Sequence, residues 1–264
     1  MKSKFILILF LFISVTLVYT ACKKDVTTVK TLPAKAVISQ LALNLAQTLY
    51  GGFGAFNISG GLNSTSTLNV SRQQLALKLT RGRQINDLNG DITCGMSVDT
   101  VLNSSFSVGD TSLSISGPIK FTFLCANGIP SGFTVSETLN ISESTSQMSD
   151  TFLLGENLTL QAVNPADPNS NINFGGTSNF TNTIKDKTVS GQTTGGTYNY
   201  TFTSVIIDAD GNIVSGSATF STKGSSAAGA WNYQGSITFL GNNMATITID
   251  RTAYTVNLET GVVS

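Results

Sequence analysis

Apolar and polar residues alternate with a period of two along most of the chain after residue 53. Ile119, Phe121 and Phe123, for example, alternate with Lys120 and Thr122. Such alternation, bounded by Gly, Asn and Ser, is typical of β-strands that bury one face. Segments 75–79, 133–136, 151–154 and 158–163 are further strand candidates. The pattern therefore predicts a largely β protein.

Only one segment has a helical period. Its apolar residues are spaced for one face of a helix, and they are Val37, Ile38, Leu41, Leu45 and Leu49. Pro33 suits the first turn, and Gly51 with Gly52 provides a stop signal. We expect a helix at about 33–50 whose apolar stripe packs on one face or one open end of the β structure.

An internal repeat occupies the C-terminal part of the chain. Four segments share the form Gly, hydroxyl, any residue, Asn or Thr, aromatic, and they start at Gly176, Gly196, Gly216 and Gly235. In an antiparallel sheet, a period near twenty corresponds to one strand out and one back. In a parallel β-solenoid it corresponds to one coil.

Turn signals favour the antiparallel arrangement. Residues 208–212 have the composition of a hairpin turn, and 241–243 and 250–252 mark two further reversals. The predicted fold class is all-β with one N-terminal helix, an antiparallel meander sheet curled into an open or closed barrel. A β-sandwich and a β-solenoid remain as alternatives.

We expect a single β-rich domain over 33–264. The one candidate boundary is the loop 164–171, which contains two prolines. Strand candidates run up to this loop from both sides, and a split there would expose a sheet edge. The size is ordinary for one β barrel or sandwich.

The N-terminus has the layout of a secretory signal. Lys2 and Lys4 form a basic start, and an apolar run over 5–18 leads to Ala21 and Cys22. The run is shorter than the roughly 20 residues that a membrane-spanning helix needs.

This segment resembles the signal of Gram-negative bacterial lipoproteins, including the mature start Cys22-Lys23-Lys24-Asp25. The resemblance implies a signal peptide over 1–21, a lipid (palmitate) on Cys22 and a tether over 22–32. In such lipoproteins an Asp directly after the lipidated cysteine favours the inner membrane. Lys23 occupies this position here, so the resemblance implies a lipid anchor in the outer membrane. The resemblance does not decide whether the protein faces the periplasm or the cell surface.

Two cysteines remain besides Cys22. Cys94 and Cys125 both lie in strand-like runs, and the periplasm is oxidising. We expect a disulfide bond that stabilises the fold by about 3 to 4 kcal/mol. Two buried thiols on neighbouring strands are the alternative.

Composition excludes several kinds of function. Without Lys2 and Lys4, thirteen basic residues face fifteen acidic ones, which argues against a nucleic acid partner. The chain has no histidine, so Ser-His-Asp and Cys-His mechanisms are excluded, and ordinary zinc sites lose their commonest nitrogen ligand. The acidic loop 208–212 does not continue as a calcium loop. We expect no enzyme activity, no cofactor and no metal, and a carboxylate glycosidase remains an alternative because such pairs are spatial.

One group of aromatic residues is a candidate ligand surface. Trp231 and Tyr233 fall two apart on one strand face and would form a sugar-stacking platform with Tyr198 and Tyr200, unless all four are core or rim residues. The preferred function is a non-enzymatic lipoprotein scaffold at the outer membrane that serves structure, adhesion or glycan contact. The alternative is a carrier of an apolar ligand in a helix-covered barrel.

Overall fold

The computed structural model describes residues 30–51, 94–167, 169–189, 192–209, 212–258 and 260–264. Residues Thr31–Ser264 form one compact unit. The predicted signal peptide, Cys22, most of the tether and the strand candidate 75–79 lie outside the described residues.

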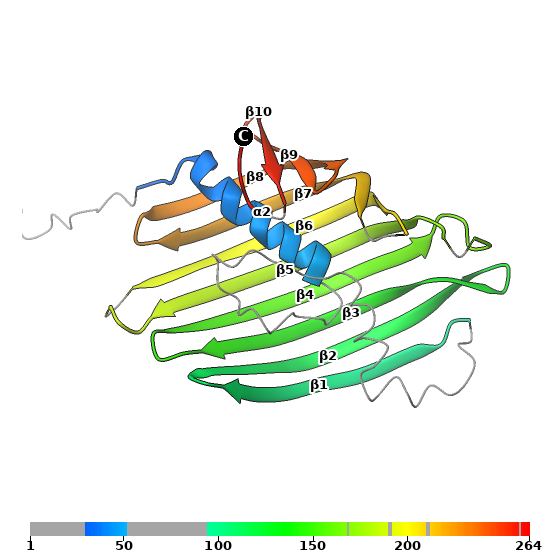
Figure 1. Ribbon diagram of the computed structural model, residues 1–264, viewed down its shortest axis with the longest axis horizontal. Coiled ribbons are helices and arrows are strands. Elements are labelled where there is room, and N and C mark those ends of the chain that lie inside the picture. The colour runs from blue at the N-terminus through cyan, green and yellow to red at the C-terminus, as the bar shows by residue number, and fades with distance from the viewer. Residues whose placement is uncertain (1–29, 52–93, 168, 190–191, 210–211, 259) are drawn as a thin grey trace, which may run out of the picture. The chain divides into compact units, whose positions relative to one another are not determined.

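The compact unit contains one antiparallel sheet and one helix (Figure 1). Each strand pairs with the next in sequence, in the order β1 to β10, and the sheet is not closed. The elements are α2 (Ala34–Gly51), β1 (Ser97–Val108), β2 (Thr111–Ala126), β3 (Ile129–Ser144), β4 (Met148–Ala162), β5 (Ile172–Asp186), β6 (Thr193–Ile207), β7 (Ile213–Ser226), β8 (Gly229–Gly241), β9 (Met244–Ile249) and β10 (Thr252–Asn257). The prediction of an all-β meander with one helix is confirmed, in its open form.

Alternation along the strands gives the sheet an inner and an outer face. In β4, Phe152, Leu154 and Leu158 are buried, whereas Leu153 and Asn157 between them are exposed. We call the face with the buried side chains the inner face. Because the side-chain period of a strand is two, a strand such as β4 buries one set of alternating residues and exposes the other.

The helix covers part of the inner face. All five residues of its predicted stripe are at most 7% exposed. The hydroxyl of Tyr200 in β6 donates a hydrogen bond to the carbonyl of Leu41 at 3.2 Å. In Figure 1, α2 lies across the C-terminal half of the sheet. The prediction of a helix that packs on one face of the sheet is confirmed.

The chain is already attached to the sheet before α2 begins. Thr31 forms a β-bridge with Ala230, and the Leu32 amide donates to the Ala230 carbonyl at 2.8 Å. The hydroxyl of Tyr233 donates to the carbonyl of Leu32 at 2.5 Å. The predicted tether over 22–32 therefore ends two residues early, because its last two residues are docked on β8.

The repeat corresponds to one strand with its turn, not to a strand out and a strand back. Its four copies lie on β5, β6, β7 and β8, one copy to each strand. The expected correspondence was wrong because these strands are longer than average, at 13 to 15 residues. The glycine that starts a copy allows close approach between strands. A Cβ on Gly176, which has a φ of 126°, would lie 2.1 Å from the Asn157 carbonyl oxygen.

The predicted turns are confirmed, but two of the strand candidates belong to one strand. Residues 208–212 connect β6 to β7, 241–243 connect β8 to β9, and the chain reverses at Asp250 and Arg251 between β9 and β10. Segments 151–154 and 158–163 both belong to the single strand β4, except that residue 163 lies just beyond its end. Gly155 and the two polar residues that follow it, Glu156 and Asn157, pair in register with β3 and β5.

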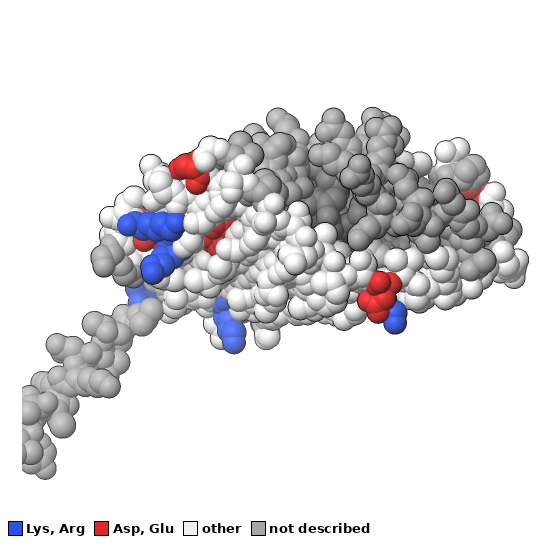
Figure 2. Space-filling view, turned by 90° about the horizontal axis from the view of Figure 1, so that it is seen from below, with Lys and Arg blue, Asp and Glu red and all other residues white. Residues whose placement is uncertain are grey.

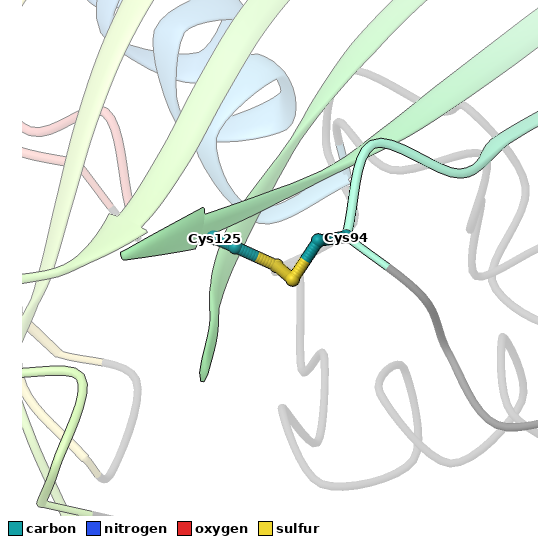
Figure 3. The surroundings of a disulfide bond; sticks show 2 residues. All are labelled: Cys94 and Cys125. Carbon is teal, nitrogen blue, oxygen red and sulfur yellow. A yellow bond between two sulfur atoms is a disulfide. The ribbon is translucent and has the colours of Figure 1, made fainter. Parts of the chain in front are cut away.

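The predicted disulfide joins Cys94 to Cys125 (Figure 3). Cys94 precedes β1 and Cys125 lies at the end of β2, with their Cα atoms 5.5 Å apart. The amide of Gly95 also donates to the carbonyl of Phe123 at 3.0 Å. The covalent bond therefore fixes the first strand to its neighbour at one end.

Candidate functional site

The four aromatic residues of the predicted ligand surface lie on the inner face of the sheet. Tyr198 and Tyr200 are each 1% exposed and Trp231 is 8% exposed, while Tyr233 is partly buried. The register of β6, β7 and β8 puts all four on the same side. The structure therefore brings them to one face, as a core beneath the N-terminal segment and α2 and not as an open platform.

The polar atoms of these rings are occupied by the protein itself. The Trp231 indole donates to the hydroxyl of Thr222 at 3.0 Å. Tyr200 and Tyr233 donate to backbone carbonyls, as described above. Burial raises the pKa of Tyr198 to about 12, against a hydrogen bond with Asn44 on α2. A ligand would reach Tyr198 and Tyr200 only after α2 had moved.

A row of polar side chains crosses the inner face next to these aromatics. Glu137 in β3 pairs in register with Glu156 in β4, and Glu156 pairs with Ser178 in β5. Their exposed fractions are 4%, 1% and 0%. The Ser178 hydroxyl donates to Oε1 of Glu156 at 2.8 Å. Two buried carboxyl groups thus lie side by side on the inner face.

The two carboxyls are short of donors. Among the described residues, neither oxygen of Glu137 nor Oε2 of Glu156 has a hydrogen-bond partner when both groups are ionised. Burial, followed by the charge of the neighbouring Glu137, raises the pKa of Glu156 to about 8, against the hydrogen bond from Ser178. Burial also raises the pKa of Glu137 to about 7, against a hydrogen bond from Glu156. The pair is therefore most stable when one acid is protonated and its hydroxyl donates a hydrogen bond to the other, ionised acid.

A second acidic pair lies further along the same two strands. Asp150 in β4 pairs in register with Glu143 in β3, and both are buried. Burial, followed by the charge of Glu143, raises the pKa of Asp150 to about 7, against a backbone hydrogen bond from Thr151. The N-terminal strands of the sheet thus hold four acids on the inner face.

These acids were not singled out from the sequence, although a signal was present. Glu137 lies between Val135 and Leu139 at a spacing of two, and Glu156 lies in the same way between Leu154 and Leu158. Residues two apart on a strand share a face, so both glutamates are on the apolar face by position alone. The scattering of the acids along the chain concealed their proximity, because cross-strand neighbours are far apart in sequence.

The acidic pairs do not form a metal site or an open cleft. Among the described residues, no three His, Cys, Asp or Glu side chains are arranged to hold a metal ion. A glycosidase needs two carboxyls on either side of an accessible substrate bond, whereas Glu137 and Glu156 are adjacent and nearly inaccessible. Within the same residues, no helix combines the length and the apolar character that a membrane crossing requires.

An open groove lies over strands β6 to β8 and the turn after β9. Its volume is about 550 Å³, and it is lined by Asn199, Thr201, Thr219, Phe220, Ser221, Gln234, Gly235 and Asp250. Most of these side chains belong to the exposed set of the alternating pattern, so the groove opens on the outer face. The Asn199 side-chain amide donates to the Ser221 hydroxyl at 3.1 Å.

The chemistry of the groove is that of amides and hydroxyls. Asp250 is the one charged residue among those that line it. Figure 2, which views the molecule from one side, shows few charged side chains on this face, most of them near one end. A neutral ligand with many hydroxyl groups matches such a surface, because amides and hydroxyls both donate and accept hydrogen bonds.

Comparison with known proteins finds no match for this chain among protein-family models, curated proteins or solved structures.

Proposed function

We propose that this protein is a non-enzymatic lipoprotein of the outer membrane that contacts a neutral glycan through the groove on its outer face. The observation that carries the proposal is the contrast between the two faces. The hydroxyls of Tyr200 and Tyr233 are bonded to the chain's own helix and N-terminal segment, while the amides and hydroxyls of the groove are open to solvent.

The groove explains which ligand is expected. Gln234 and Ser221 are exposed neighbours on paired strands, so a sugar ring above them would exchange hydrogen bonds with both. Phe220 lines the groove but is only 5% exposed, so stacking contributes little. Binding through a few hydrogen bonds on an open surface gives affinities of about 1 mM, or about −4 kcal/mol.

A titration with defined sugars tests this proposal. Cellohexaose, chitohexaose and maltohexaose are added to the isotope-labelled mature chain, and amide chemical shifts are recorded. We expect one of them to shift the side-chain amides of Asn199 and Gln234. Gln234→Ala should weaken binding by a factor of roughly 5, since one hydrogen bond contributes about 1 kcal/mol.

The control for this titration is Asn140→Ala, which removes an exposed amide from the outer face of β3. It should leave the affinity unchanged. The absence of shifts with all three sugars, or an equal loss in both variants, would contradict glycan binding in the groove.

The anchor is tested separately. Cys22→Ser should abolish incorporation of labelled palmitate and release the protein from the outer-membrane fraction, since a protein without acyl chains has no stable anchor. A variant that still fractionates with the membrane would refute lipid attachment at this cysteine.

A second function, carriage of an apolar ligand, is favoured by the position of α2. The helix lies over an inner face built from Phe, Tyr, Leu and Ile, and Tyr200 and Tyr233 attach this segment through single hydrogen bonds. If the helix is a lid, the native protein should copurify with a lipid that mass spectrometry detects. Tyr200→Phe together with Tyr233→Phe should then speed its release. A protein that is free of lipid after mild purification from its membrane would favour the filled scaffold.

A further inference from the structure

The two edges of the open sheet differ in how they are protected. At one edge, β10 spans six residues, and the C-terminal tail folds back on it. Val263 forms a β-bridge with Val256, and the Ser264 amide donates to the Thr255 carbonyl at 2.8 Å. The tail therefore occupies backbone groups that an edge strand would otherwise present.

The opposite edge, β1, has no such cover among the described residues. Its twelve residues pair with β2 along their whole length and without a bulge. In an antiparallel ladder, the N–H and C=O groups of every second residue point away from the neighbouring strand. The far side of β1 thus presents a long, regular row of donors and acceptors.

The sequence of β1 lacks the features that usually block edge pairing. Natural edge strands carry Lys, Pro or bulges, or are very short. β1 contains no Lys, Arg or Pro and only one charged residue, Asp99, while Val101 on its outer face is 69% exposed. The disulfide and the hydrogen bond at Gly95 hold the beginning of the strand against β2. Within the described part of the chain the edge is therefore open, and its beginning is fixed against β2.

The pattern of β1 is complementary to itself. A two-fold axis perpendicular to the sheet and passing by Leu102 would set Thr100 opposite Ser104, hydroxyl against hydroxyl, on the inner face. On the outer face it would set Val101 opposite Asn103 and Asp99 opposite Ser105, so no like charges meet. A Thr–Ser pair of this kind is favourable across antiparallel strands, and an interface of this symmetry closes on itself.

We propose that β1 is the dimerisation edge of this protein, where it pairs antiparallel with β1 of a second copy and makes the two sheets continuous. The second copy is the partner because the same residues satisfy both sides of the pairing. The tail on β10 blocks the equivalent contact at the other edge, so the assembly stops at two copies.

A photo-crosslinking experiment in cells that produce the full-length chain tests the proposal. Benzoylphenylalanine replaces Val101 in β1 or, as the matched control, Val214, an exposed valine of the interior strand β7. We expect a crosslinked product of about twice the chain mass from position 101 and none from position 214. No such product at 101, or a product whose mass requires a different protein, would overturn the proposal.

A pair of lysines tests the register. With the photoreactive residue at Ser105, the substitutions Val101→Lys and Asn103→Lys set like charges opposite each other across the two-fold axis. They should reduce the crosslinked dimer at least tenfold, while Val214→Lys should leave it unchanged. Protease resistance of the lysine variant checks that it is folded, and a dimer that persists in this folded variant would exclude β1 as the contact.

Discussion

The buried acidic pair makes the stability of this protein fall as the pH rises. A carboxyl whose pKa is raised by folding binds its proton more tightly in the folded than in the unfolded state. Its contribution to the free energy of unfolding is therefore complete below the unfolded pKa and is lost as the pH rises to the folded pKa. For Glu156 this interval runs from 4.5 to about 8.

The expected slope follows from one proton. Each group that titrates in this interval lowers the free energy of unfolding by about 1.4 kcal/mol per pH unit, or at most about 5 kcal/mol over the interval for Glu156. Glu156→Gln keeps the shape and can donate its amide to Glu137, but it cannot ionise. The variant should have a slope that is smaller by about 1.4 kcal/mol per unit, and it should be more stable than the parent at pH 8.

Urea unfolding at pH 5, 6, 7 and 8, with the disulfide intact, measures these slopes. Asp99→Asn, which neutralises an exposed carboxyl on β1, is the matched control and should follow the parent. A parent protein whose stability is constant or increases over this range would refute the reasoning. So would a Glu156→Gln variant whose pH dependence equals that of the parent.

Three further predictions concern stability alone. Replacing both Cys94 and Cys125 by Ser should lower the free energy of unfolding by about 3 to 4 kcal/mol, and reductant should have the same effect on the urea midpoint of the parent. Tyr200→Phe should cost about 1 kcal/mol, measured by thermal unfolding, because it removes the buried hydrogen bond to α2. Gly235→Ala should cost about 1 to 3 kcal/mol in the same assay, because a Cβ there would lie 1.9 Å from the carbonyl oxygen of Thr248.

The sequence predicts the elements of this fold well because each depends on local chemistry. The helical stripe from Val37 to Leu49 is buried as expected. The turn at 208–212 is closed by Asp208, whose Oδ1 accepts a hydrogen bond from the Asn212 amide at 2.7 Å. These features are determined by residues within a few positions of each other.

The rows across the sheet could not be predicted in the same way. Alternation fixes the face on which Glu137 lies, but its neighbour in the row depends on the register of β3 with β4. Register depends on the length of every turn and on bulges, such as the one between Phe174 and Gly176 against β6. The proximity of Glu137 and Glu156 is therefore a property of the assembled sheet.

The aromatic residues illustrate the same distinction. Alternation correctly puts Trp231 and Tyr233 on one face, yet it does not say whether that face meets solvent or another element. The helix decides the matter, since its apolar stripe has to be buried against the sheet. An aromatic face beside an amphipathic helix elsewhere in the same chain is therefore better interpreted as the surface on which that helix packs.

The disulfide has a physical reason in the topology of an open sheet. An edge strand has a neighbour on one side only, so it opens more readily than an interior strand. The edge at β10 is held by the backbone of the C-terminal tail, whereas β1 is held by the bond between Cys94 and Cys125. Both devices keep an edge in place, but the tail also pairs with outward backbone groups of its strand, whereas no described residue pairs with those of β1.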